Sequence, residues 1–319
     1  SSAGKPCRVE RHIALPSQVT SMSQNSVFPP LDSLTWLARL RFVIHGRKGW
    51  GAWGERRSAR RGAGLEFADF REYTPGDDPR RVDWNLYARS DRAYVRLYEE
   101  EADLSVIIAL DGSASMEWEN RWSTARTLAE ALGSIALFGG DALRGVLLQQ
   151  GSAASPWGPH SGGERLEEWR AWLSTLSPAG ATTLDASLRD LASRLTLRAP
   201  RPALVLLLTD GYDPEGLESG IAHLAARGHE VVLLHLLTPE ELSPTLRGEL
   251  RLVDKESNVP RDVTLDSATL AAYQQRREAW QAGLQKVASK HQGRYLSLNT
   301  ATPLKRVILE ELRRAGVVR

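Results

Sequence analysis

The chain has 319 residues, 42% hydrophobic and 25% charged, which suits a globular protein with one large domain and a smaller module. Its formal net charge of +2 is too small to indicate that the chain as a whole binds nucleic acid. The single cysteine, Cys7, excludes an internal disulfide and a multi-cysteine zinc site.

No segment of the sequence is expected to enter or cross a membrane. The longest apolar runs, Leu104–Leu110 and Ala203–Leu208, have the length of strands and fall far short of a membrane span. Residues 1–30 are polar and lack the apolar core of a signal peptide. We therefore expect a cytoplasmic protein.

The N-terminal third is predicted to contain a tail and a separate segment. Residues 1–30 are rich in Ser, Gln and Pro without periodicity, which predicts a disordered or extraneous tail. Residues 31–102 form the separate segment, in which Leu31–Phe42 has helical spacing and residues 47–64 are basic and contain glycines. Arg92–Tyr98 alternates like a strand.

Residues 103–319 are predicted to form the main domain, because strand and helix patterns alternate there. Predicted strands are Leu104–Leu110, Arg144–Gln150, Ala203–Thr209, Val231–Leu237 and Arg294–Leu298. Predicted helices are Asn120–Phe138, Glu164–Leu176, Leu184–Leu195, Leu217–Arg227, Ser267–Lys290 and Pro303–Arg314. Residues 151–163 are predicted to be a loop with at most a short edge strand, and residues 239–264 a hairpin. This order predicts an α/β fold, a doubly wound, mostly parallel sheet with helices on both faces.

Oxygen-bearing side chains follow three of these elements. Asp111, Ser113 and Ser115 come directly after the first buried strand, Thr182 precedes a helix, and Asp210 follows another buried strand. In open α/β sheets, ligands bind in loops at the carboxyl ends of the strands. Two carboxylates and three hydroxyls suit a hard divalent cation, Mg²⁺ first, with Mn²⁺ or Ca²⁺ as alternatives. Taken singly, Asp and Ser at such places also form helix N-caps and turns.

The pattern Asp111-x-Ser113-x-Ser115, with Thr182 and Asp210 in later loops, resembles the metal-ion-dependent adhesion site (MIDAS) of von Willebrand factor A domains. The resemblance implies a fold of that Rossmann-like type. It also implies that the two serines and the threonine bind the ion directly, while the aspartates act directly or through water. The residues after Asp210 depart from the pattern, so Asp213 or Glu215 is expected to alter the rim of the site.

A second resemblance concerns residues 64–89, just before the main domain. This stretch is similar to the signature of the DUF58 family, as are residues 252–256 and the helix that follows them. Members of that family are commonly encoded beside MoxR-type AAA+ ATPases, which implies an adaptor or chaperone role. The matching side chains form either a structural clasp or a partner interface: Glu66, Phe67, Asp69, Arg71, Tyr73, Gly76, Asp77, Asp78, Arg80, Asp83, Trp84 and Arg89.

The sequence favours a binding module over an enzyme. It contains no nucleophile elbow, HExxH, Walker A or dinucleotide motif. We expect a metal-dependent protein-binding domain whose partner presents an acidic residue and is a MoxR-type AAA+ ATPase or its client. One alternative is a metal-dependent hydrolase, a phosphoesterase, that uses the same cation. The other is a scaffold that needs no metal.

Overall fold

A computed structural model of the chain describes residues 7–9, 31–45, 66–72, 87, 92, 94–99, 104–180, 183–198, 202–244, 248–254 and 260–319. The chain divides into two compact units, residues 1–50 with 104–319 and residues 51–103. The segment 31–102, which the sequence pattern groups together, is therefore shared between them. Residues 31–45 belong to the first unit, and the strands within 66–99 belong to the second.

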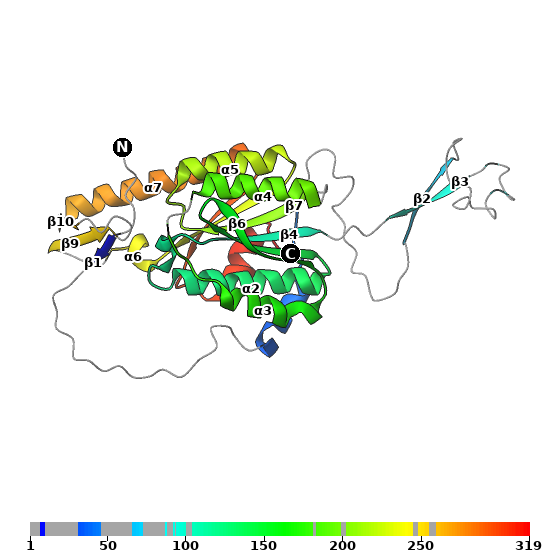
Figure 1. The fold of residues 1–319 in the computed structure, drawn as a ribbon, viewed down its shortest axis with the longest axis horizontal. Helices are drawn as coiled ribbons and strands as arrows, with labels where there is room; N and C mark the ends of the chain where they lie inside the picture. Colours follow the sequence, from blue (N-terminus) through cyan, green and yellow to red (C-terminus); the bar gives the residue numbers. More distant parts are fainter. Residues whose placement is uncertain are drawn as a thin grey trace. The chain divides into compact units, whose positions relative to one another are not determined.

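The first unit is built on a six-stranded sheet with the order β11-β8-β7-β4-β5-β6 (Figure 1). All neighbours in it are parallel except β5 and β6. The strands of the middle of the sheet are apolar almost throughout and buried, as expected for parallel strands covered on both faces. The six strands are β4 (Ser105–Asp111), β5 (Ala142–Gln149), β6 (Ser152–His160), β7 (Ala203–Thr209), β8 (Glu230–Leu237) and β11 (Arg294–Asn299).

Helices cover both faces of this sheet, each over its own apolar core (Figure 1). One face carries η1 (Leu31–Arg39), α2 (Arg121–Gly139), α3 (Leu166–Thr175) and the C-terminal turns α8 (Leu304–Arg306) and η5 (Val307–Leu312). The other carries α4 (Leu184–Arg198), α5 (Pro214–Ala226) and α7 (Ser267–Lys290). The predicted doubly wound, mostly parallel α/β fold is confirmed.

The edge strand β6 is longer than the sequence predicts. Residues 151–163 were expected to hold at most a short strand, yet Ser152–His160 pairs antiparallel with β5, with shifts in register. An edge strand can hold Pro156 and Pro159, because one of its sides needs no hydrogen bonds. Trp157 also packs against Trp169 of α3, with ring centroids 5.1 Å apart, which fixes the strand over the core.

A smaller sheet has three strands, two of which lie between β8 and α7 in the chain. The predicted hairpin is present as β9 (Gly248–Asp254) and β10 (Pro260–Leu265), which are antiparallel. A short strand β1 (Cys7–Val9) pairs with the other edge of β9. The rest of the expected tail 1–30 lies outside the described residues. The short helix α6 (Pro239–Leu242) precedes the hairpin, and the single turns η3 (Ala114–Glu117) and η4 (Gly163–Arg165) belong to the main sheet's loops.

The second unit contains an antiparallel pair of strands. These are β2 (Glu66–Glu72) and β3 (Tyr94–Glu99), with an irregular register between Phe67 and Asp69. The predicted strand at Arg92–Tyr98 is thus present, shifted by a residue or two. Within the described ranges of both units, we find no helix with the length and apolar character of a membrane span.

Candidate metal centre

The expected cation ligands follow two neighbouring strands in the middle of the sheet. β4 ends at Asp111, and β7 ends at Thr209, directly before Asp210. The strands are parallel and in register up to Leu110 opposite Leu208, so their carboxyl ends lie together. Both aspartates are buried, with 1% and 2% of their surface exposed. The sheet therefore brings together two carboxylates that are 99 positions apart in the sequence.

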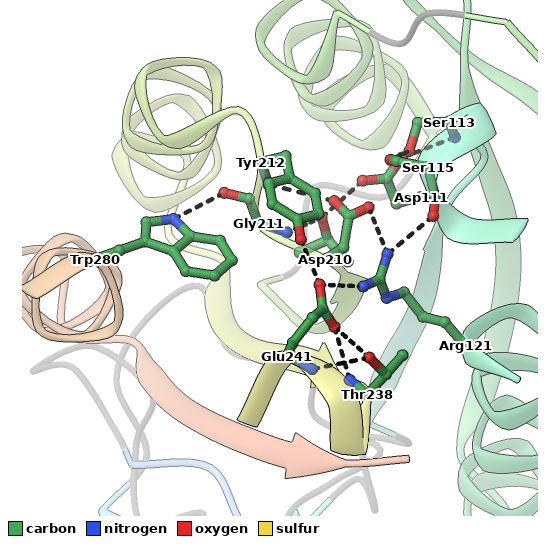
Figure 2. A network of polar contacts seen from close by, with 11 residues as sticks. Asp111, Ser113, Ser115, Arg121, Asp210, Gly211, Tyr212, Thr238, Glu241 and Trp280 are labelled. Atoms are coloured by element: carbon green, nitrogen blue, oxygen red, sulfur yellow. Dashed lines mark hydrogen bonds and ion pairs between the residues drawn. The ribbon is translucent and has the colours of Figure 1, made fainter. Parts of the chain in front are cut away.

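Hydrogen bonds orient the first aspartate and the two serines. The Thr209 hydroxyl donates to Asp111 Oδ2 over 2.7 Å, and the Ser113 amide donates to Asp111 Oδ1 over 3.0 Å. The hydroxyls of Ser113 and Ser115 are 2.9 Å apart, and both serines are buried. Figure 2 shows these side chains gathered with Asp210 in one small volume.

Residues shortly before Thr182 are hydrogen-bonded to the loop that follows β4. The Ala114 amide donates to the Gly180 carbonyl over 2.9 Å, and the Ala179 amide donates to the Gly112 carbonyl over 2.9 Å. Thr182 itself lies outside the described residues. The structure thus brings together four of the five predicted ligand side chains, and Thr182 as a ligand stays a prediction.

The two buried carboxylates carry more negative charge than their surroundings balance. Burial, followed by the charge of Asp111, raises the pKa of Asp210 to about 7. Burial also raises the pKa of Asp111, although hydrogen bonds from Thr209 and Ser113 oppose the rise. A cation placed between the two would offset both effects.

The donor set fits a hard divalent cation. Carboxylate and hydroxyl oxygens are ligands that Mg²⁺ and Ca²⁺ accept. In the parts of the chain that the structure describes, no group of three His, Cys, Asp or Glu side chains is arranged to hold a metal ion, so the set here is two carboxylates with hydroxyls. Asp111, Ser113, Ser115 and Asp210 would hold the ion, which would supply an electrophilic position for an oxygen of another molecule.

The contacts that the structure shows for Asp213, which the sequence suggests for the rim of this site together with Glu215, are those of a helix cap. Asp213 is the N-cap of α5 and accepts a hydrogen bond from the Gly216 amide over 2.9 Å. It also accepts from the Leu184 amide, at the start of α4, over 3.3 Å. Glu215 is exposed in the first turn of α5. A helix cap is a frequent use of an Asp before a Pro, and this is the role that the structure shows for Asp213.

The sequence pattern does not indicate that an arginine lies beside the site. Arg121, the first residue of α2, is fully buried. Its Nη1 donates to the Ser115 carbonyl over 2.9 Å and to Asp210 Oδ2 over 3.3 Å, and its Nη2 donates to Glu241 Oε1 over 2.5 Å (Figure 2). Burial alone would lower the pKa of Arg121, but Asp210 and Glu241 raise it above its usual value. The guanidinium is therefore a permanent charge inside the site.

Two aromatic residues complete the surroundings of Asp210. The Tyr212 hydroxyl donates to Glu241 Oε1, and its ring stacks on Trp280 of α7 with centroids 5.3 Å apart. The Trp280 indole donates to the Gly211 carbonyl over 3.3 Å (Figure 2). In the sequence, Arg121 and Trp280 look like ordinary helix residues, because nothing local indicates which faces meet at the end of the sheet.

The residues of the N-terminal signature are described only in part. Glu66, Phe67, Asp69 and Arg71 belong to β2 of the second unit. The other eight predicted signature residues lie outside the described ranges: Tyr73, Gly76, Asp77, Asp78, Arg80, Asp83, Trp84 and Arg89. A clasp and an interface both stay open as predictions for this stretch.

Several solved structures resemble parts of this chain. BatB from Bacteroides thetaiotaomicron has a TM-score of 0.38 at 16% identity, covering 67% of this chain and 98% of its own. The von Willebrand factor type A structure from Catenulispora acidiphila has a TM-score of 0.39 at 11% identity, covering 70% and 43%. The proximal thread matrix protein 1 of the mussel byssus, solved with a zinc-occupied MIDAS motif, has a TM-score of 0.39 at 13% identity, covering 67% and 47%.

Sequence relatives and a family model identify the family to which the chain belongs. Uncharacterized proteins of Mycobacterium tuberculosis and Mycobacterium bovis are each 30% identical to it over 215 residues, 65% of this chain. The match spans 66% of the length of each relative. The model of the family described as "protein of unknown function DUF58" matches residues 69–283. The chain belongs to the DUF58 family.

Proposed function

We propose that this chain is a metal-dependent protein-binding module. A divalent cation, Mg²⁺ first with Mn²⁺ or Ca²⁺ as alternatives, is held by Asp111, Ser113, Ser115, Thr182 and Asp210 and binds an acidic side chain of a partner protein. The observation that supports this most directly is the buried pair of carboxylates at the ends of β4 and β7, with the pKa of Asp210 raised to about 7.

The residues around the ion suit capture of an oxygen ligand. Two carboxylates balance a dication without giving the site a net negative charge, and the charges of Arg121 and Glu241 beside Asp210 offset each other. An acidic group on a partner would therefore meet an environment that is not repulsive. The partner that we propose, a MoxR-type AAA+ ATPase or its client, follows from the resemblance of residues 64–89 to a family whose members are commonly encoded beside such ATPases.

The first experiment measures the cation itself. Protein stripped with a chelator is titrated with Mg²⁺, Mn²⁺ and Ca²⁺ while its thermal unfolding is followed. At about 100 times the dissociation constant, binding adds about 2.7 kcal/mol to the free energy of unfolding. The rise should disappear in Asp111→Ala and persist in Asp185→Ala, a control that removes a carboxylate on the surface of α4. A chain that gains no stability from any of the three ions contradicts the cation site.

The second experiment measures the partner. A purified MoxR-type ATPase should bind the full chain in the presence of the preferred cation, and binding should stop on chelation or in Asp111→Ala/Ser113→Ala. Circular dichroism checks that the double variant is folded. Binding that ignores both chelator and variant contradicts the metal bridge. Turnover of a phosphoester that stops on chelation would instead favour the hydrolase alternative.

A further inference from the structure

We propose that Glu241 controls the cation affinity of this centre by drawing the Arg121 guanidinium toward itself, which weakens the pairing of that guanidinium with Asp210. The inference rests on the proposed cation site and names a residue that positions another charge without being a ligand. Glu241 lies on α6, outside the three loops that carry the predicted ligands.

The guanidinium of Arg121 is shared unequally between two carboxylates. Its Nη2 lies 2.5 Å from Glu241 Oε1, whereas its Nη1 lies 3.3 Å from Asp210 Oδ2. The Arg121 side chain is fully buried, and those of Asp210 and Glu241 are 2% and 13% exposed. Solvent screens such charges weakly, so a change of a few tenths of an ångström in these separations changes the electrostatic energy appreciably. Because its oxygen is closer, Glu241 interacts more strongly with the positive charge of Arg121 than Asp210 does.

Glu241 is fixed by contacts that are independent of the cation ligands. Its Oε2 accepts from the Thr238 amide over 2.7 Å, completing a capping box at the start of α6. Its Oε1 accepts from the Tyr212 hydroxyl, and its backbone carbonyl accepts from the Tyr273 hydroxyl of α7 over 2.9 Å. The carboxylate therefore has a defined place toward which Arg121 is drawn (Figure 2).

A cation and Arg121 compete for the same carboxylate. While Glu241 neutralises the guanidinium, Asp210 remains available to an ion. If the charge of Glu241 is removed, Asp210 becomes the carboxylate that pairs directly with the guanidinium, and the cation and Arg121 then repel each other across that side chain. The Tyr212 hydroxyl acts in the opposite direction. Its hydrogen bond to Glu241 Oε1 weakens the attraction of that carboxylate for Arg121.

The test measures Mn²⁺ binding to the full chain by calorimetry and by the electron paramagnetic resonance signal of the free ion. In Glu241→Gln, which keeps the size and one acceptor, the dissociation constant should rise about tenfold. In Tyr212→Phe it should fall about threefold. The matched control is Glu130→Gln, which breaks the buried pair with Arg170 between α2 and α3. It should destabilise the fold comparably and leave the dissociation constant unchanged.

Each outcome either supports or contradicts the proposed role of Glu241 or the cation site on which it rests. Opposite shifts in Glu241→Gln and Tyr212→Phe, with none in Glu130→Gln, support the role of Glu241. Equal weakening in Glu241→Gln and Glu130→Gln indicates general loosening and overturns it, as does unaltered affinity in Glu241→Gln. If that variant does not fold, Tyr212→Phe decides alone, and unchanged or weaker binding overturns the inference. A wild-type chain that binds no Mn²⁺, Mg²⁺ or Ca²⁺ contradicts the proposed cation site itself, which is a distinguishable failure.

Discussion

Gly211, directly after Asp210, occupies a backbone position that other residues adopt only under strain. Its φ is +74°, in the left-handed region, and a Cβ there would lie 2.8 Å from Leu284 Cδ1 of α7. Its carbonyl accepts the hydrogen bond from Trp280. The turn that carries Asp210 thus depends on a residue without a side chain.

Replacement of this glycine tests how closely α7 packs on the turn. Gly211→Ala should lower the free energy of unfolding by about 2 to 3 kcal/mol, because backbone strain and a collision with Leu284 add up. Gly228→Ala is the control, since Gly228 has a φ of +86° but no atom nearer than 3.8 Å to its Cβ position. It should cost only about 1 kcal/mol. Equal losses in denaturant unfolding would show that Leu284 moves aside freely.

At the scale of elements, the start of α5 joins two helices on one face of the sheet. Asp213 caps α5 through the Gly216 amide and also accepts from the first amide of α4. One side chain therefore connects the starts of α4 and α5. This arrangement gives an acidic residue close to Asp210 a structural role of its own.

Removal of the cap separates its structural role from a metal role. Asp213→Ala should lower the free energy of unfolding by about 1 to 2 kcal/mol, because one side chain satisfies amides of two helices. Its effect on cation affinity should be within about twofold, below 0.5 kcal/mol. Glu215→Ala, exposed two residues later, should change neither quantity by more than about 0.5 kcal/mol. A large loss of cation affinity in Asp213→Ala would show instead that this residue acts at the rim of the metal site.

At the scale of the whole molecule, the stability of the fold at low pH is expected to depend on a residue at the amino ends of the strands. This end of the sheet lies opposite the proposed cation ligands. His229 precedes β8 at the amino ends of the strands, is 5% exposed, and accepts from the Ala203 amide over 3.1 Å. Burial, and then the charge of Arg227, lowers the pKa of His229 to about 4. The unfolded chain takes up this proton near pH 6.5, whereas the folded chain resists it.

His229 should therefore destabilise the fold as the pH falls. Its contribution is fully present above about pH 6.5 and is lost progressively toward pH 4, with a slope of up to about 1.4 kcal/mol per pH unit. His229→Gln keeps an acceptor for Ala203, so the difference in unfolding free energy between wild type and variant should shrink between these pH values. Above pH 7 the difference should be constant. A difference that stays constant down to pH 4 would contradict the buried, neutral histidine.

Much of this architecture could be predicted from the sequence, because continuous apolar runs such as Ala203–Thr209 and helical spacing such as Ser267–Lys290 are properties of local segments. The position of Asp111 and Asp210 at one end of the sheet could be predicted for the same reason, since each comes at the end of such a strand. Strand β6 could not, because its pairing depends on Trp157 meeting α3. Arg121 and Glu241 could not either, since a buried ion pair 120 positions apart leaves no local pattern.

The pairing of Phe42 with Val318 has a consequence for how the protein is made. The amide of Arg41 donates to the Arg319 carbonyl, and the amide of Arg319 donates back to Arg41. A ribosome produces residues 41–43 before it produces residues 317–319, and residues 44–316 are made in between. During that interval the apolar residues Leu34 and Leu37 of η1 lack part of the structure that holds this segment in place, and a nascent-chain chaperone has a hydrophobic segment to bind.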